Sequence, residues 1–191
     1  MNIAIFASGN GSNFQALVDD ELIKPHVKLL VCDKPNAYVL ERANKAHIPV
    51  FLFEAKNYLD KEAFETKILL ELRGLEIDLL VLAGYMRLIG PTLLAEFPEQ
   101  IVNLHPSLLP EFKGKDAIGQ AIRANVLETG VTAHFVDAGM DTGPIIDQVK
   151  VAIDKAETVD TLAKKIHQIE HVFYPKVIRV LIQNGGNDQL S

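Results

Sequence analysis

The chain has 191 residues, 48% of them hydrophobic and 23% charged, with a formal net charge of −6. This length and composition predict one globular domain and exclude a disordered chain. The acidic balance argues against a general nucleic-acid-binding protein but allows a local anion site. Because Cys32 is the only cysteine, an intrachain disulfide and a cysteine-rich zinc site are both excluded.

The N-terminal segment Met1–Ser8 lacks the basic start and the long apolar core of a signal peptide. The longest apolar run, Leu79–Met86, is far too short to cross a bilayer. We therefore expect a cytoplasmic protein without a membrane partner. No repeat or linker divides the sequence, so residues 1–191 are expected to form a single domain.

Over the first hundred residues, short apolar runs alternate with stretches of helical spacing. Strands are predicted at Ile3–Ala7, Val27–Cys32, Val50–Phe53 and Leu79–Ala83, and helices at Phe14–Asp20, Tyr38–Ala46, Lys61–Arg73 and from Pro91 onward. The all-apolar run at 79–83 is typical of a parallel strand covered on both faces. This alternation predicts a doubly wound parallel sheet with right-handed crossovers.

The pattern changes after Pro110. A helix is predicted near Asp116–Asn125, strands at Val131–Val136 and Ile145–Val151, and a long helix over Thr158–Ile182 that Pro175 would kink or interrupt. The two strands are joined only by a loop, which predicts at least one antiparallel pair at the C-terminal side of the sheet. The tail Asn184–Asn187 should fray. The predicted fold is therefore α/β: Rossmann-like and mostly parallel, with an antiparallel C-terminal strand.

The first candidate site is the segment Ser8–Asn13, which follows the first strand and opens a helix. Backbone N–H groups and the helix dipole meet there, Gly11 allows close approach of a ligand, and Ser12 and Asn13 add polar donors. A phosphate is the expected ligand. Phe14 stands where a dinucleotide fingerprint has its third glycine, and no Lys-Ser/Thr pair forms a Walker loop. A capped turn without a ligand is the alternative.

The second candidate site is the segment Asn103-Leu104-His105-Pro106-Ser107-Leu108-Leu109-Pro110. The preceding pair Ile101-Val102 is interpreted as the end of a buried strand, since Pro106 prevents continuation. The carboxyl ends of parallel strands form the ligand crevice of such sheets. Asn103 and His105 point to the same side of an extended chain, and together an amide and an imidazole can hold and protonate an oxyanion. A buried pair satisfied by the backbone is the alternative.

Asp141 lies in a loop shaped by Gly139, Gly143 and Pro144. A carboxylate near a histidine can raise the pKa of that histidine and later accept a proton. The alternative for Asp141 is a surface acid. His134, in the strand before this loop, is alternatively a core histidine bonded to the backbone.

One further loop and one further residue each allow a functional and a structural interpretation. The loop Gly84–Gly90 combines apolar side chains, backbone groups and an arginine, which suits a flat heterocycle carrying carboxylates, but ordinary loop packing explains it equally well. Glu170 is on the flank of the apolar stripe of the long helix, so its carboxylate needs a partner. That partner is a ligand hydroxyl or amine, or a lysine.

Four motifs occur in order along the chain: Ser8–Asn13, Asn103–Pro110, His134–Asp137 and Asp141–Pro144. With them the chain resembles the phosphoribosylglycinamide formyltransferase family, from Ile3 to about Val180. That family uses 10-formyltetrahydrofolate in purine synthesis. The resemblance implies a formyltransferase fold in which about residues 1–100 bind the phosphate and about residues 101–182 carry the folate and catalytic groups.

The resemblance also implies a role for each matching residue. Asn103, His105 and Asp141 would be catalytic, Gly11, Ser12, Asn13 and Glu170 would bind glycinamide ribonucleotide, and Lys61, Met86, Arg87, Leu88, Ile89 and Asn103 would bind 10-formyltetrahydrofolate. The glycinamide amine would attack the formyl carbon directly, without a metal ion. The expected partners are these two small molecules and no nucleic acid, with the chain as a monomer or homodimer.

The chain departs from the family pattern in the segment 111–116, where Lys113 and Lys115-Asp116 replace the usual residues, and slightly at 130–133. Formyltetrahydrofolate deformylase and other folate-dependent formyltransferases share the His-Pro-Ser motif. They are expected to carry a further domain and to lack the phosphate loop. A non-catalytic nucleotide-binding module is the alternative from a different class, and it would leave Asn103, His105 and Asp141 without a role.

Overall fold

The computed structural model describes residues 1–185. Its strands are β1 (Ile3–Ala7), β2 (Val27–Cys32), β3 (Val50–Leu52), β4 (Leu79–Leu82), β5 (Ile101–His105), β6 (Glu128–Phe135) and β7 (Ile145–Ala152). Its α-helices are α1 (Ser12–Val18), α2 (Val39–Ala46), α3 (Lys61–Gly74), α4 (Pro91–Glu96), α5 (Ala117–Arg123) and α6 (Val159–Asn184), with short 3₁₀ turns at Lys24–His26 and Ala55–Asn57.

The strands form one sheet in the order β3-β2-β1-β4-β5-β6-β7. Strands β1 to β5 pair in parallel, while β6 is antiparallel to both β5 and β7. The predicted α/β fold, with a mostly parallel sheet and antiparallel pairing at its C-terminal side, is confirmed. Strand β6 alone runs against the others, because a direct loop joins it to β7 instead of a crossover helix.

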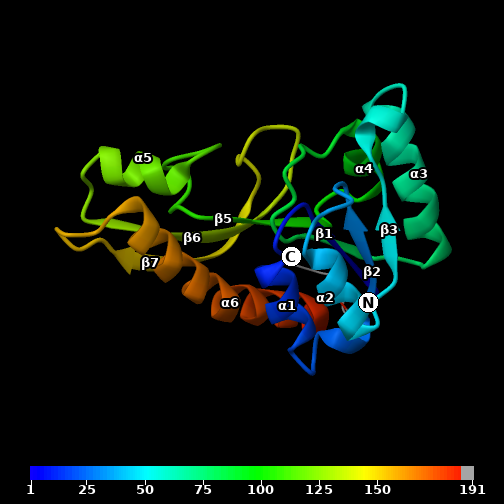
Figure 1. Cartoon of the computed structure of the whole chain (residues 1–191), viewed down its shortest axis with the longest axis horizontal. Coiled ribbons are helices and arrows are strands. Elements are labelled where there is room, and N and C mark those ends of the chain that lie inside the picture. Colours follow the sequence, from blue (N-terminus) through cyan, green and yellow to red (C-terminus); the bar gives the residue numbers. More distant parts are fainter. Residues whose placement is uncertain (186–191) are drawn as a thin grey trace.

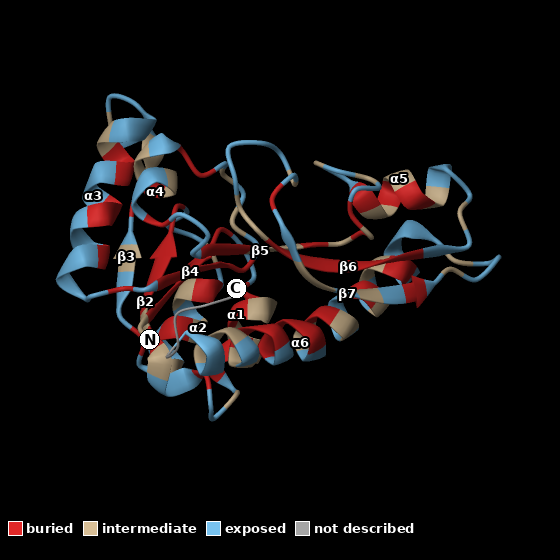
Figure 2. Ribbon diagram, turned by 180° about the vertical axis from the view of Figure 1, so that it is seen from behind, coloured by how far each residue is buried: buried red, intermediate tan, exposed pale blue. Residues whose placement is uncertain are grey.

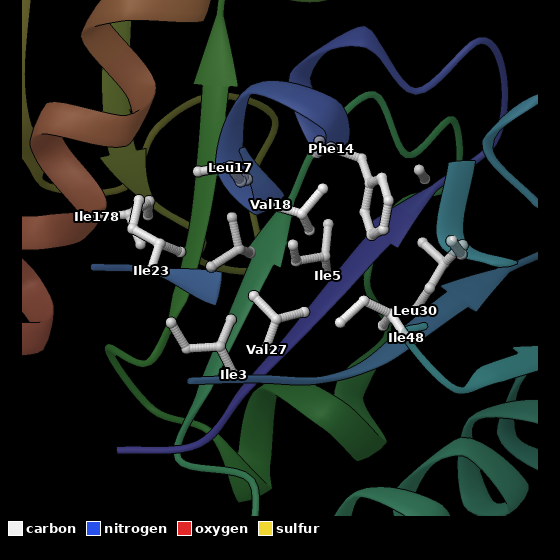
Figure 3. Close-up of a cluster of buried hydrophobic side chains, with 14 of the residues drawn as sticks. Ile3, Ile5, Phe14, Leu17, Val18, Ile23, Val27, Leu30, Ile48 and Ile178 are labelled. Carbon is white, nitrogen blue, oxygen red and sulfur yellow. The ribbon is translucent and has the colours of Figure 1, made fainter. Parts of the chain in front are cut away.

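Helices cover both faces of this sheet (Figure 1). Along β1, successive side chains point to opposite faces, so Ile3 and Ile5 enter one core while Ala4 and Phe6 enter the other. The first core is closed by α1, α2 and α6, and the second by α3 and α4. In Figure 3, Phe14 of α1 lies over the β1 side chains of the first core. Figure 2 shows that the inner strands of the sheet are buried, whereas the edge strands β3 and β7 and the outer surfaces of the helices are largely exposed.

Helix α6 is continuous from Val159 to Asn184, so the predicted interruption at Pro175 is wrong. Proline removes one helical N–H donor, but its fixed φ is compatible with a helix. The flanking residues Tyr174 and Ile178 are fully buried, and this packing outweighs the lost hydrogen bond. The predicted fraying of the tail falls partly outside the described residues, since Gly186 and Asn187 lie beyond residue 185.

Strand β5 continues through His105, whereas the sequence suggested that it ended at Val102. It continues because it has partners on both sides: Asn103 pairs with Leu82 of β4 and with His134 of β6. Asn103 and His105 therefore sit on a hydrogen-bonded strand. The rigid strand fixes both side chains better than a loop would.

The strand order reverses between β1 and β4, and the loops after these strands form the crevice of the sheet. Ser8 joins the two loops: its N–H donates to the Gly84 carbonyl at 3.1 Å, and its Oγ accepts the Met86 N–H at 2.9 Å. In the part of the chain that the structure describes, no helix is long and apolar enough to span a membrane.

Candidate active site

His105 is held from both sides of its ring at the carboxyl end of β5. Its Nε2 donates to the Phe112 carbonyl at 2.8 Å, and its Nδ1 lies 3.4 Å from Asp141 Oδ2. A carbonyl and a carboxylate are both acceptors, so only the imidazolium has a proton for each. The residue is only 5% exposed, so its ring has little contact with solvent. The contacts with Phe112 and Asp141 therefore fix the orientation of the ring.

Asn103 and His134 face each other across the antiparallel pair β5–β6. The Asn103 Nδ2 lies 3.2 Å from His134 Nε2, and His134 Nδ1 lies 2.8 Å from the Phe135 carbonyl. Since a carbonyl can only accept, His134 Nδ1 is the donor to Phe135, and its Nε2 is left facing the Asn103 amide. His134 is thus the backbone-bonded histidine that the sequence allowed, and it also orients the Asn103 amide.

Asp141 lies between the two histidines, with Oδ1 3.6 Å from His134 Nε2. The Gly114 N–H donates to Asp141 Oδ2 at 2.8 Å. Burial opposes ionisation of this carboxyl, but the contacts with His134 and Gly114 and the charge of His105 outweigh it and lower the pKa of Asp141 below its ordinary value. The structure therefore favours a carboxylate at this position.

One loop holds both His105 and Asp141 through backbone groups. The Phe112 carbonyl and the Gly114 N–H belong to the segment 111–116, where the sequence departs from the family pattern. Phe112, Gly114 and Asp116 all have positive φ angles, so the loop has a tightly specified path. Gln120 of α5 braces it by donating to the carbonyls of Lys113 (3.2 Å) and Lys115 (2.8 Å).

The predicted phosphate loop, Ser8–Asn13, connects β1 to α1 and includes the first residues of that helix. Gly11 is the N-cap residue of α1 with φ 76° and ψ 29°, and the helix has no side-chain cap at this end. The first N–H groups of a helix have no intrahelical acceptor. The loop therefore presents backbone donors near Ser12 and Asn13.

Glu170 of α6 adjoins this loop. Its Oε2 accepts the Asn13 Nδ2–H at 3.0 Å, so its partner within the chain is an amide and not a lysine. The residue is 6% exposed. Burial raises the pKa of Glu170, and the hydrogen bond from Asn13 and the charge of His167 only partly offset that effect.

The predicted folate residues lie around the loop after β4. Arg87 Nε donates to the buried Asp33 carboxylate at 2.7 Å, and Lys61 Nζ donates to the Leu88 carbonyl at 3.0 Å. Met86 and Leu88 are exposed, by 77% and 61%. Ile89 is instead buried in the core beneath α3 and α4.

The structure brings His105 directly to Asp141 and Asn13 to Glu170, while Asn103 reaches Asp141 only through His134. The sequence analysis left the part played by His134 open and missed the Phe112 and Gly114 backbone groups. A glycine at 114, in a segment with no predicted element, was the available signal. Within residues 1–185, no group of three or more His, Cys, Asp or Glu side chains is placed to hold a metal ion.

A Rossmann-like sheet with an acid–base cluster at its carboxyl edge defines an α/β enzyme, and the profile of the formyl transferase family matches residues 1–178. The chain belongs to this family, and within it to the phosphoribosylglycinamide formyltransferases.

Three relatives support that placement. The phosphoribosylglycinamide formyltransferase of Bacillus subtilis is 54% identical over 182 residues, which are 94% of this chain and 93% of that protein. Glycinamide ribonucleotide transformylase 1 from Geobacillus kaustophilus is 57% identical, with a TM-score of 0.90 over 94% of this chain and 97% of the other. The Bacillus halodurans phosphoribosylglycinamide formyltransferase is 48% identical, with a TM-score of 0.93 over the whole of both chains.

Proposed function

We propose that this chain transfers the formyl group of 10-formyltetrahydrofolate to the amine of glycinamide ribonucleotide in purine biosynthesis, with Asn103, His105 and Asp141 as its catalytic residues. One observation carries the assignment of these residues: at the carboxyl end of β5 the His105 imidazole lies beside the Asp141 carboxylate from the loop after β6, and the Asn103 amide of β5 is linked to the same carboxylate through His134. The 54% identity to the Bacillus subtilis enzyme supports the reaction itself.

In this mechanism the glycinamide amine attacks the formyl carbon. The new C–N bond forms a tetrahedral intermediate, and the bond from that carbon to the folate nitrogen then breaks. The Asn103 amide donates a hydrogen bond to the oxyanion, and the positive charge of the His105 imidazolium, whose two N–H groups face Phe112 and Asp141, stabilises it electrostatically. The Asp141 carboxylate, 3.4 Å from His105 Nδ1, keeps the ring oriented and charged. It also assists transfer of a proton from the attacking amine to the folate nitrogen through water.

The substrates are assigned to the two loops of the crevice. Gly11, Ser12 and Asn13 bind the phosphate of glycinamide ribonucleotide through backbone and amide donors, and Glu170 accepts from its ribose or glycinamide end. The folate is bound by a second set of residues: Lys61, Met86, Arg87, Leu88, Ile89 and Asn103. The division into a phosphate half over about residues 1–100 and a folate and catalytic half over about residues 101–182 stays a prediction, and the proposed residue sets cross it, since Lys61 and the loop residues 86–89 precede residue 100 and Glu170 follows it. A cytoplasmic location and a monomeric or homodimeric state stay predictions.

The test is to mix the purified protein with 10-formyltetrahydrofolate and glycinamide ribonucleotide and to follow the folate absorbance. Release of tetrahydrofolate together with formylglycinamide ribonucleotide supports the proposal. Release of formate, with water as the acceptor, would indicate a deformylase. Binding of the ribonucleotide without turnover would indicate a nucleotide-binding module and contradict the proposal.

A further inference from the structure

Arg42 of α2 donates hydrogen bonds to the phosphate loop from the side that faces α2. Its Nε donates to the Asn10 carbonyl at 2.8 Å and its Nη2 to Asn10 Oδ1 at 3.0 Å. Its Nη1 donates to Gln15 Oε1, at 3.2 Å, on the first turns of α1. The guanidinium carbon also lies 4.9 Å from the centre of the Tyr38 ring, which limits its rotation. One side chain therefore joins the loop, α1 and α2.

These contacts fix the direction of peptide N–H groups in the loop. In a planar trans peptide the C=O and N–H bonds point in opposite directions. The Asn10 carbonyl is held by Arg42, so the Gly11 N–H of the same peptide points away from α2. The Gly9 carbonyl accepts the Val39 N–H at 3.1 Å, so the Asn10 N–H points away as well. Within residues 1–185, neither N–H has a protein acceptor.

Close packing of Gly11 against Val39 also limits how the peptides of this loop can turn. Gly11 lies so near α2 that an added Cβ would be 2.6 Å from Val39 Cβ. The loop therefore has little room to turn its carbonyls outward. Successive N–H groups that point in one direction form an anion-binding concavity, and this holds without any charged side chain in contact with the anion.

We infer that Arg42 is a positioning residue for the substrate phosphate: it holds the Asn10 and Gly11 peptides with their N–H groups facing the anion site. This inference rests on the proposed function and deepens it. A guanidinium forms such contacts through a planar fork, so a lysine that keeps the charge cannot make all three. Arg42→Lys therefore separates positioning from a simple positive charge.

The experiment measures kcat and both substrate KM values for wild type, Arg42→Lys, Arg42→Gln and Asn10→Ala. Arg73→Gln is the matched control, since Arg73 also makes two side-chain hydrogen bonds but pairs with Glu96 between α3 and α4. We expect both Arg42 variants to raise the KM for glycinamide ribonucleotide about tenfold or more, and Asn10→Ala to raise it less, because charge-assisted hydrogen bonds are lost. The KM for the folate co-substrate and kcat should change less than about twofold, as should all three constants of Arg73→Gln.

Inorganic phosphate, used as a competitive inhibitor against glycinamide ribonucleotide, gives a second readout, and its inhibition constant should rise in parallel. A normal KM in Arg42→Lys with a raised KM in Arg42→Gln would overturn positioning in favour of charge alone. Normal KM values in both, or an equal rise in the KM for the folate co-substrate, would also overturn the inference. If an Arg42 variant does not fold, Asn10→Ala decides by the same constants. A wild-type protein without transfer activity would overturn the proposed function, and this inference with it.

Discussion

Asp141 Oδ2 lies 3.4 Å from His105 Nδ1, on the opposite side of the ring from the hydrogen bond to Phe112. The imidazole is therefore fixed between a carboxylate and a carbonyl. Both neighbours are acceptors, so the two ring nitrogens face Phe112 and Asp141, and a positive charge on this ring would stabilise an oxyanion electrostatically.

Asp141→Asn keeps the size of the side chain but removes its charge. We expect kcat to fall about 100-fold or more, the usual effect of losing one preorganised electrostatic contact. Substrate KM values should change little in comparison, while the thermal midpoint falls modestly because the stabilising carboxylate is lost. Steady-state kinetics and a thermal melt on the same purified sample test this. Turnover close to that of wild type would remove Asp141 from the mechanism.

Asp141 should also contribute to the pH dependence of stability. Its pKa in the folded protein is below the ordinary value of 3.8, so the folded state binds fewer protons than the unfolded state. The stabilisation is therefore present above pH 3.8 and is lost as the pH falls through the lowered pKa. Urea unfolding from about pH 5 to about pH 3 should show a shallower loss of stability in Asp141→Asn. Parallel curves for the two proteins would contradict this.

Gly11→Ala should weaken the phosphate loop. Gly11 has a φ of 76°, and an added Cβ would lie 2.6 Å from Val39 Cβ. The left-handed conformation alone costs an alanine about 1 to 2 kcal/mol. We expect the free energy of unfolding to fall by at least that amount and the KM for glycinamide ribonucleotide to rise. Gly74→Ala, in the last turn of α3 with open space around its added Cβ, is the control: its free energy of unfolding should not fall, and its KM for glycinamide ribonucleotide should stay at the wild-type value.

Glu170→Gln should make stability less dependent on pH. Burial raises the pKa of Glu170 above its ordinary 4.5, with the Asn13 hydrogen bond and the His167 charge opposing it, so the folded state binds more protons than the unfolded state. The wild-type protein consequently loses stability as the pH rises from 4.5 through the raised pKa. The glutamine variant lacks that loss and should be the more stable of the two at neutral pH. Urea unfolding at several pH values measures the difference, and a variant less stable than wild type at neutral pH would contradict it.

Asp33→Asn should weaken binding of the folate co-substrate and leave binding of glycinamide ribonucleotide nearly unchanged. Asp33 is buried just beyond the end of β2 and holds Arg87, which lies in the loop after β4, at 2.7 Å. A neutral amide holds a guanidinium less firmly than a carboxylate does. We expect the KM for the folate co-substrate to rise about tenfold, while the KM for glycinamide ribonucleotide stays within about twofold. A rise confined to the KM for glycinamide ribonucleotide would show that this ion pair supports the phosphate loop instead.

The catalytic cluster divides into parts that local sequence could and could not predict. Asn103 and His105 were predictable because both the alternation of a strand and the proline after it are local patterns. That β5 includes both residues was not, because the strand extends only where β4 and β6 supply partners. His134 remained ambiguous for the same reason, since its neighbour Asn103 is set by the β5–β6 register. The hydrogen bonds from Arg42 to the phosphate loop correspond to no periodic pattern in the sequence.

Residue spacing over a few positions was enough to predict the alternation of strands and helices, the mostly parallel sheet and the glycine loop after β1. The packed chain was needed to place Asp141 between His105 and His134, and to show that one loop holds His105 and Asp141 through its backbone. These contacts join segments that are distant in the sequence, so they depend on strand register and on backbone hydrogen bonds that form only when the whole chain packs. No local pattern of side chains encodes them.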